Sequence, residues 1–246
     1  MFVSIISVTY NAAQWIERTM TSVLNQTCKD YEYIVIDGAS TDNTMQVVRR
    51  YEPLFEGRMR YISEPDNGLY FAMNKGIVMA KGDFLWFMNA GDEVYADTTL
   101  QQVKDAFALS PDKDKANIIY GKALTADASG KTIGEYHKQA PEKLTEKSLL
   151  DGLVVCHQAM LVRRFVAPMY NTDYRIAADY DWVIRLTRIS EMNIYTGNYL
   201  CRFLADGLSQ RNYRRSWKER FTVMRRQFGL VPALIAHLKI ALRYII

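Results

Sequence analysis

The 246-residue chain has little of what marks disulfide-rich, fibrous or membrane-spanning proteins. Its three cysteines, Cys28, Cys156 and Cys201, are scattered and form no CxxC pair, which argues against a disulfide framework and a structural zinc site. Thirteen glycines and six prolines exclude collagen-like and low-complexity chains. No run reaches the ~18 uncharged apolar residues that cross a bilayer, and no basic residues precede the first apolar run as in a signal peptide. We therefore expect a cytoplasmic protein with reduced thiols.

Acidic residues are nearly absent from the end of the chain. From Arg211 onward there are nine Lys or Arg residues and one acid, Glu219, so this segment carries +8 while the whole chain carries +4. Aromatic and basic residues alternate there at helical spacing, which predicts a basic amphipathic helical tail over 211–246, with helices at about Ser216–Phe228 and Val231–Tyr244. Such a tail fits an anionic membrane surface, a dimer helix, or a lid whose arginines lie near an anionic ligand. No RNA-binding motif is present, so we expect no nucleic-acid partner.

Strand and helix patterns alternate through the first hundred residues. Nearly unbroken apolar runs separate amphipathic helices, which is typical of a parallel sheet covered on both faces. The predicted strands are Phe2–Thr9, Tyr31–Ile36, Met59–Ile62 and Phe84–Met88. Neither GxxxxGK[ST] nor GxGxxG follows any of them, which argues against a P-loop enzyme and an ordinary dinucleotide-binding domain.

The pattern loosens after Ala96, yet no linker rich in Pro, Gly or Ser interrupts it. The sequence therefore predicts one mixed α/β domain over 1–210, with a nucleotide-binding half over 1–95 and an acceptor-binding half over 96–210. In the second half the predicted helices are Thr98–Leu109 and Ala178–Ile189. The predicted strands are Ile118–Tyr120, Gln158–Val162 and Tyr199–Leu204, with a hairpin over Ala123–His137.

Polar residues follow the predicted strands directly. Thr9, Tyr10 and Asn11 follow the first strand, Asp37 the second, and the segment from Asn89 to Asp92 the fourth. Ligands of open α/β sheets bind outside the carboxyl ends of the strands, so these side chains are candidates for one site. Asp37 can instead be a turn residue, although its place after a buried strand favours a ligand contact. Asp42, in the turn that follows, is expected to cap the next helix.

Four motifs in this order resemble the family-2 glycosyltransferases. They are SIISVTYNAAQWIERTMTSVLNQT, YEYIVIDGASTDNT, EPDNGLYFAMNKGIVMAKGDFLWFMNAGDE, and the pair CHQAMLVRR and IAADYDWVIRL. The resemblance is dense over residues 2–95, thinner to about 210, and does not extend into the tail. It implies a GT-A (Rossmann-like) fold, a mostly parallel mixed sheet flanked by helices, and transfer of a sugar from a nucleotide-diphosphate sugar with inversion.

The resemblance also implies a divalent cation. The family holds it with an Asp-x-Asp type motif after the fourth strand, where this chain has Asn89-Ala-Gly-Asp92. Asp92 is then the main metal ligand and Asn89 contacts the ribose. Hard oxygen ligands favour Mg²⁺ or Mn²⁺ over zinc. The alternative is a strand-to-loop turn in which Asp92 is a helix N-cap.

Further site residues come from the same comparison. Thr9 and Tyr10 match the loop that packs on the base, and Asp37 the acid that accepts from its N–H. Asn74 lies in a helix segment of the family's nucleotide site. Two other residues of this region each have two interpretations. Lys75 either supplies positive charge to the nucleotide or is a solvated lysine, and Asp66 either contacts the sugar or ribose or is a turn acid.

The general base is expected on a helix of the second half. Asp179 in Ala-Ala-Asp-Tyr-Asp-Trp aligns with the family's base, and Ala178 stands where the family often has Glu. Asp181, two residues on, points elsewhere on a helix. His157 either faces the acceptor or is a core or loop histidine. The resulting hypothesis is an inverting glycosyltransferase, using a UDP- or dTDP-linked sugar and a glycan or lipid-linked glycan acceptor, cytoplasmic or peripheral at the inner membrane face. The alternatives are a catalytically weak nucleotide-sugar-binding protein and a nucleotidyltransferase. The sequence is compatible with an oligomer and does not give the oligomeric state.

Overall fold

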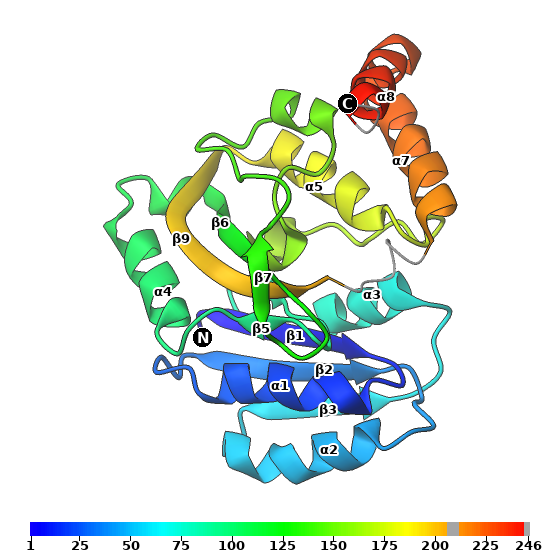
Figure 1. Ribbon diagram of the computed structural model, residues 1–246. Helices are drawn as coiled ribbons and strands as arrows, with labels where there is room; N and C mark the ends of the chain where they lie inside the picture. The colour runs from blue at the N-terminus through cyan, green and yellow to red at the C-terminus, as the bar shows by residue number, and fades with distance from the viewer. Residues whose placement is uncertain (206–211, 244–246) are drawn as a thin grey trace.

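The computed structural model describes residues 1–205 and 212–243, so Arg211 and Tyr244, which belong to the predicted tail, lie outside the described residues. One nine-stranded sheet forms the centre of the molecule (Figure 1). Its strands are β1 (Val3–Thr9), β2 (Tyr31–Asp37), β3 (Met59–Ser63), β4 (Phe84–Phe87), β5 (Glu93–Val94), β6 (Ala116–Ala126), β7 (Thr132–Glu135), β8 (Met160–Arg163) and β9 (Met192–Leu204). They lie in the order β3-β2-β1-β4-β8-β6-β9-β5, and β7 pairs with β6 at the side of this row.

Helices cover both faces of the sheet. They are α1 (Ala13–Leu24), α2 (Thr44–Tyr51), α3 (Leu69–Met79), α4 (Thr99–Leu109), α5 (Ala178–Ile189), α7 (Tyr213–Phe228) and α8 (Leu230–Arg243). Buried residues of α1, α2 and α4 share one apolar core with the sheet, and those of α3, α5, α7 and α8 share the other. In Figure 1 the two terminal helices lie beside α5, far from α1 and α2. No helix in the described part of the chain is long and apolar enough to cross a membrane.

The first four strands are parallel. β1 lies between β2 and β4, and β2 pairs with β3. Alternate residues of β1 enter opposite cores: Val3 and Ile5 pack with α1, whereas Ile6 and Val8 pack with α3. Because both faces of the strand are buried, every position is apolar or small, which is the pattern that predicted a parallel sheet. The four predicted strands are confirmed to within two residues.

The second half of the sheet contains the antiparallel pairs of the predicted mixed sheet, but its strands are longer than predicted. β8 is antiparallel to both β4 and β6, and β9 runs parallel to β6. β6 has 11 residues and β9 has 13, whereas the sequence predicted a three-residue strand at Ile118–Tyr120 and a strand beginning only at Tyr199. The two strands are interrupted by register shifts near Gly121, where an added Cβ would lie 2.5 Å from the Asn198 carbonyl oxygen. Glycine and polar residues at this bend hide the strand pattern in the sequence.

Candidate active site

The carboxyl ends of the parallel strands meet at one edge. Thr9, Asp37 and Ser63 end β1, β2 and β3 and lie opposite one another in register. The N–H groups of Met88 and Ala90 donate to carbonyls of β1 at 2.8 and 3.1 Å, which extends the pairing of β4 and brings Asn89 to the same edge. The structure therefore gathers the polar residues that the sequence placed after these strands.

Two polar atoms at this edge have no hydrogen-bond partner. They are Thr9 Oγ1 and Asn89 Oδ1, and both atoms are buried. A buried polar atom left unpaired costs about 1–3 kcal/mol, so such atoms are rare unless a ligand or ordered water completes them. The unpaired pair marks this edge as the candidate binding site.

An exposed aromatic ring and a carboxylate flank the end of β2. Tyr10 is 64% exposed although it directly follows a fully buried strand. A Cβ added to Gly38 would lie 3.0 Å from Asp66 Oδ2 and 3.4 Å from Tyr10 Cδ2, so only glycine keeps this gap open. Asp66 Oδ1 also accepts the Gly68 N–H at 2.9 Å, which gives Asp66 the turn contact expected as its alternative.

Asp37 is fully buried at the same edge. Its carboxylate accepts the Ser40 N–H at 2.9 Å, the Ser40 hydroxyl at 2.5 Å and the Ser63 hydroxyl at 2.6 Å. A carboxylate has about four lone-pair positions, so one further donor, such as the N–H of a base, can still be accepted. Asp37 therefore combines a structural role with the capacity predicted for it.

The loops after β1 and β2 are joined by two polar side chains. Asn11, at φ +47°, accepts the Thr41 N–H at 2.8 Å. Asp42 accepts the N–H groups of Thr44 at 2.9 Å and Ala13 at 3.1 Å, the first residues of α2 and α1. Asp42 was expected to cap α2, but the N-cap residue is Asn43 and Asp42 instead ties the starts of two helices together. These contacts fix the loop that carries Tyr10.

The segment from Asn89 to Glu93 is held between α1 and the end of β9. Asp92 is 3% exposed, and its Oδ1 accepts the Leu204 N–H at 3.0 Å. Burial raises the pKa of Asp92 to about 7, despite the Leu204 N–H, which lowers it. Gly91, at φ +103°, passes so close to Leu204 that an added Cβ would lie 2.5 Å from its Cδ2. The end of β9 therefore lies directly over the predicted metal ligand.

The fit of a metal ion to these residues can be tested from the donor atoms. Within residues 1–205 and 212–243, no group of three or more His, Cys, Asp or Glu side chains is placed to hold an ion. The unpaired Asn89 Oδ1 is a hard oxygen donor, and Asp92 adds one carboxylate. Mg²⁺ is often bound by one or two carboxylates and by the phosphates of its substrate. The donors fit a hard cation shared with a diphosphate and do not fit one held by the protein alone.

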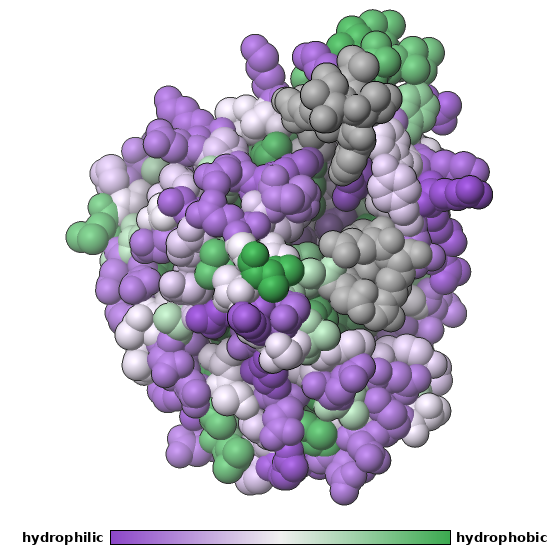
Figure 2. All heavy atoms as spheres, in the orientation of Figure 1, coloured by the Kyte–Doolittle hydropathy of each residue, from purple (hydrophilic) through white to green (hydrophobic). Residues whose placement is uncertain are grey.

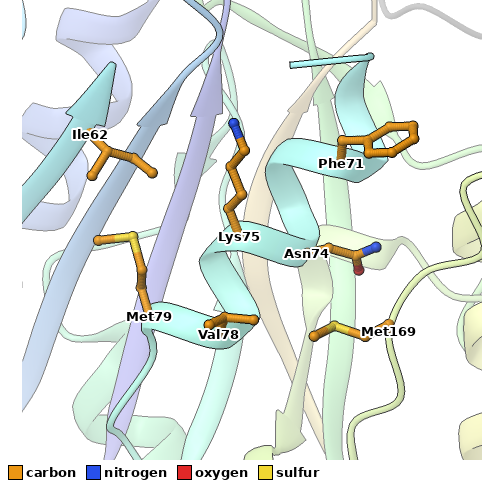
Figure 3. A pocket seen from close by; sticks show the side chains of 7 residues that line it. All are labelled: Ile62, Phe71, Asn74, Lys75, Val78, Met79 and Met169. Carbon is orange, nitrogen blue, oxygen red and sulfur yellow. The ribbon is translucent and has the colours of Figure 1, made fainter. Parts of the chain in front are cut away.

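Asn74 and Lys75 have partners of their own on α3. The Asn74 amide donates to the Tyr170 carbonyl at 3.0 Å and accepts the Tyr170 N–H at 2.7 Å. Lys75 pairs with Glu64 at 2.9 Å and donates to the Pro65 carbonyl at 3.2 Å. Both residues border a hollow of about 380 Å³ on α3 (Figure 3), which is otherwise apolar; its other lining residues are Ile62, Phe71, Val78, Met79 and Met169. Because the Lys75 ammonium group already has these partners, its contacts favour the interpretation in which it does not supply charge to the nucleotide.

Asp179 lies in the first turn of α5. Burial raises its pKa above the ordinary value, more than the Tyr180 N–H and the positive charge of Arg220 lower it. The Tyr70 hydroxyl of α3 lies 3.4 Å from Asp179 Oδ1 and 2.7 Å from the Ile176 carbonyl oxygen. A carboxylate with a raised pKa is a stronger base than an ordinary aspartate, which is the property that proton abstraction requires.

The other two candidates in this half lie inside the core. Asp181 is 3% exposed and accepts from Arg185 at 2.8 Å and Gln227 at 2.7 Å, so it points away from Asp179. His157 is 5% exposed, lies 2.5 Å from the Tyr170 hydroxyl and packs among aromatic rings. Burial lowers the pKa of His157 to about 4, which keeps it neutral at pH 7. His157 thus occupies the core position that was its alternative interpretation, and no contact places it toward an acceptor.

Sequence reasoning missed two residues beside Asp179. Tyr70 reads in the sequence as one apolar position of α3, and nothing in the pattern shows that its hydroxyl lies near α5. Glu219 of α7 accepts the N–H groups of Ile176 and Ala177, just before α5; its one signal in the sequence is that it stands alone among basic residues.

The chain belongs to glycosyl transferase family 2, whose model matches residues 4–167. Among its relatives is a PGL/p-HBAD biosynthesis glycosyltransferase of Mycobacterium tuberculosis, 32% identical over 186 residues, 74% of this chain and 68% of the relative. An uncharacterized glycosyltransferase of the same organism is 31% identical over 194 residues, covering 77% and 70% of the two chains. The protein is thus a glycosyltransferase, as the motifs predicted.

Solved structures show the same fold. Residues 1–349 of S. aureus TarS, solved in complex with UDP-GlcNAc, align with a TM-score of 0.72 at 17% identity, over 97% of this chain and 73% of that one. The mannosyltransferase PcManGT from Pyrobaculum calidifontis, solved in complex with GDP-Man and Mn²⁺, aligns at 0.66 and 18% identity, over 96% and 73%. These likenesses confirm the predicted fold class, a mixed α/β sheet of the GT-A type flanked by helices.

Proposed function

We propose that the protein transfers one sugar, with inversion, from a UDP- or dTDP-linked donor to a glycan or lipid-linked glycan acceptor in cell-surface polysaccharide synthesis. The observation that carries this proposal is the edge where Thr9 Oγ1 and Asn89 Oδ1 lack partners beside the exposed ring of Tyr10. The named relative acts in PGL/p-HBAD biosynthesis, and TarS was solved with UDP-GlcNAc, which supports a glycan pathway and a nucleotide-sugar donor.

The donor is proposed to lie across the ends of β1, β2 and β4. The Tyr10 ring stacks on the base, and Asp37 accepts the N–H that uracil and thymine carry. Asp66, facing the gap at Gly38, contacts the ribose or sugar. Asn11 holds the loop that presents Tyr10, because its side chain is already bonded to the next loop.

The sugar diphosphate is proposed to extend from there toward Asn89 and Asp92. Asp92 would hold Mg²⁺ or Mn²⁺, which supplies positive charge to the departing diphosphate when bound, and the unpaired Asn89 oxygen contacts the ribose or adds a second donor to the ion. Asn89 takes the place of the family's first acid, so the chain offers one carboxylate for this purpose. The Mn²⁺ in the PcManGT complex supports a divalent cation in this family.

Asp179 is proposed as the general base. Its carboxylate takes the proton of the acceptor hydroxyl while that oxygen bonds to the anomeric carbon from the face opposite the diphosphate. The bond from the anomeric carbon to the diphosphate oxygen breaks in the same step, which inverts the configuration. The Tyr70 hydroxyl, which donates to the Ile176 carbonyl at 2.7 Å, lies 3.4 Å from this carboxylate.

A thermal-shift panel tests the donor proposal. UDP, dTDP, GDP, UDP-GlcNAc and GDP-mannose are each added with and without Mn²⁺, and the expected result is stabilisation by uridine or thymidine diphosphates that grows with Mn²⁺. No stabilisation by any nucleoside diphosphate would overturn the proposal. Binding without sugar transfer to any acceptor would favour a binding protein, and pyrophosphate release from a nucleoside triphosphate would favour a nucleotidyltransferase.

We further propose that α8 rests on an anionic bilayer that holds the acceptor. One face of α8 exposes large apolar side chains, and hydrophobic atoms gather over this helix in Figure 2. Each of these side chains is half to two-thirds exposed: Leu230, Val231, Leu234, Ile235 and Leu238. Residues 212–243 contain eight Lys or Arg and one Glu, which complements an anionic surface. Sedimentation with phosphatidylglycerol vesicles should be lost in the double variant Leu234→Gln, Ile235→Gln. Vesicle binding equal to wild type would show that this face does not contact the bilayer. A wild-type dimer that becomes monomeric in the variant would show that it is a dimer interface instead.

A further inference from the structure

Glu219 is the single acid of the basic segment, and it faces the protein instead of solvent. Its side chain is 12% exposed. Its carboxylate accepts three consecutive backbone N–H groups, from Arg175 at 3.0 Å, Ile176 at 2.8 Å and Ala177 at 3.1 Å. It also accepts from the Arg215 guanidinium at 2.8 Å. A carboxylate with four donors is fully used in this position.

The three N–H groups belong to the segment that starts α5. Ala177 is the N-cap of α5, and no side chain of the segment itself caps the helix. A helix begins with N–H groups that have no partner within the helix, and negative charge there is stabilising. Glu219 of α7 therefore holds, from a distant part of the chain, the peptide segment that leads into α5, up to the N–H of the N-cap residue Ala177, and places a negative charge beside the N-terminus of the helix.

Two residues further along is Asp179. The Ile176 carbonyl accepts the Tyr70 hydroxyl at 2.7 Å, and that hydroxyl lies 3.4 Å from Asp179 Oδ1. One peptide segment thus binds Glu219 through its N–H groups and Tyr70 through its carbonyl. A displacement of this segment would shift Asp179 relative to Tyr70 of α3, whereas the residues at the ends of β1 and β2 make none of these contacts.

We propose that Glu219 is a positioning residue for Asp179, and that α7 completes the active site by clamping the start of α5. The inference rests on the proposed function in taking Asp179 as the base. It gives the tail a role in catalysis that is separate from the contact proposed for α8, since Glu219 faces α5 and the exposed apolar residues lie on the next helix.

Hydrogen–deuterium exchange of wild type and Glu219→Gln tests the clamp without any substrate. The amide replaces an oxygen by an NH₂ group and removes the charge, so amides of residues 175–181 should exchange at least tenfold faster while those of β1 and β2 are unchanged. Arg215→Met is the matched control, since it removes the exposed ion pair and leaves the carboxylate. Its exchange should equal that of wild type.

Kinetics on the same variants test the consequence for the base. With the donor that gives the largest thermal shift, kcat should fall about 10–100-fold in Glu219→Gln while the KM for donor stays within twofold, because small displacements of a reacting group cost this much. The acid limb of the pH–rate profile should move to lower pH, since a loosened segment exposes Asp179 and lowers its pKa toward the ordinary value. Glu219→Asp keeps the charge but shortens the side chain by one methylene, so its kcat should lie between those of wild type and Glu219→Gln. It replaces Glu219→Gln if that variant does not fold.

Three results would overturn the inference. The first is exchange at residues 175–181 of Glu219→Gln that equals wild type, and the second is an unchanged kcat in Glu219→Gln when the wild type is active. The third is faster exchange throughout Glu219→Gln together with a loss of both donor affinity and kcat, which would show a general loss of structure. A wild-type protein that transfers no sugar contradicts the proposed function instead, and the exchange comparison still decides whether Glu219 clamps α5.

Discussion

The neighbouring acids Asp179 and Asp181 offer the sharpest test of the catalytic proposal. Both changes to Asn are nearly isosteric and each removes one charge from the same turn of α5. Their surroundings differ: Asp179 Oδ1 has the Tyr180 N–H at 2.8 Å and the Tyr70 hydroxyl at 3.4 Å, whereas Asp181 is paired with Arg185 and Gln227. We expect one variant to lose activity and the other to lose stability.

For Asp179→Asn the loss is in the reaction. General-base catalysis contributes about 10²–10⁴-fold, so kcat should fall by that factor, or ~3–5 kcal/mol in the barrier. Stability should not fall. The folded-state pKa of Asp179 is raised, so its ionised form is disfavoured by folding above its unfolded pKa of about 4, and a neutral amide removes that cost. The acid limb of the wild-type pH–rate profile, which rises as Asp179 loses its proton, should disappear in the variant.

For Asp181→Asn the loss is in the fold. The side chain of Asp181 is 5% exposed. The variant removes the charge that Arg185 pairs with, leaving Arg185 its contact with the Met169 carbonyl, and weakens the bond from Gln227 of α7. Weakening hydrogen bonds to a charged group costs about 1–3 kcal/mol, and each kcal/mol lowers the Tm of a protein this size by roughly 2–4 °C. The assay is sugar transfer below both melting temperatures, with calorimetry for Tm. Full activity in Asp179→Asn with an inactive but stable Asp181→Asn would refute the assignment of the base.

Three further predictions concern the binding edge. Tyr10→Ala should weaken nucleoside diphosphate binding by about 1–3 kcal/mol through lost stacking, measured by calorimetric titration, with an unchanged Tm because the ring is exposed; unchanged affinity would remove the base from this loop. Asp92→Asn should abolish the Mn²⁺-dependent part of the thermal shift while the amide oxygen keeps the Leu204 contact, and a persisting Mn²⁺ effect would move the ion to other residues. Gly91→Ala should lower the free energy of unfolding by about 1–3 kcal/mol, well above the loss in the control Gly57→Ala. Both glycines have positive φ, but only at Gly91 would the added Cβ meet Leu204. Equal losses in denaturant unfolding would show that φ alone matters.

The first half of the fold was predictable because its strands are buried on both faces. The sequences of such strands are nearly continuous apolar runs, so the polar and glycine residues of the turns between them are easy to recognise. The buried face of α1 was less predictable. Helical spacing in the sequence selects Trp15, Thr19, Ser22 and Val23; Thr19 and Val23 are buried, but the other two buried residues are Ile16 and Met20 in place of Trp15 and Ser22. The neighbouring stripes are only one residue apart, and the sheet that selects between them lies outside the helix.

The second half was less predictable because its strands depend on partners far away in the sequence. The start of β9, Met192 to Asn198, contains polar residues and a glycine, and it is a strand because β6 lies beside it. The site followed the same division. Thr9, Asp37 and Asn89 are placed by local strand ends, so topology brings them together. The contacts of Lys75, His157 and Glu219 depend on how distant elements pack, and composition and spacing carry no information on that.

The insertion of β8 between β4 and β6 has a consequence for how the protein is made. Phe84 of β4 pairs with Arg163 of β8, so one side of β4 has no strand to pair with until some 79 further residues have been synthesised. At ~5–20 residues per second, this interval lasts about 4–16 s. During that time the nascent chain presents a bare edge ending in the apolar side chains of FLWF, the kind of surface that associates with other chains. The edge of β4 is therefore the part of the growing polypeptide that is most open to such association before its second half emerges.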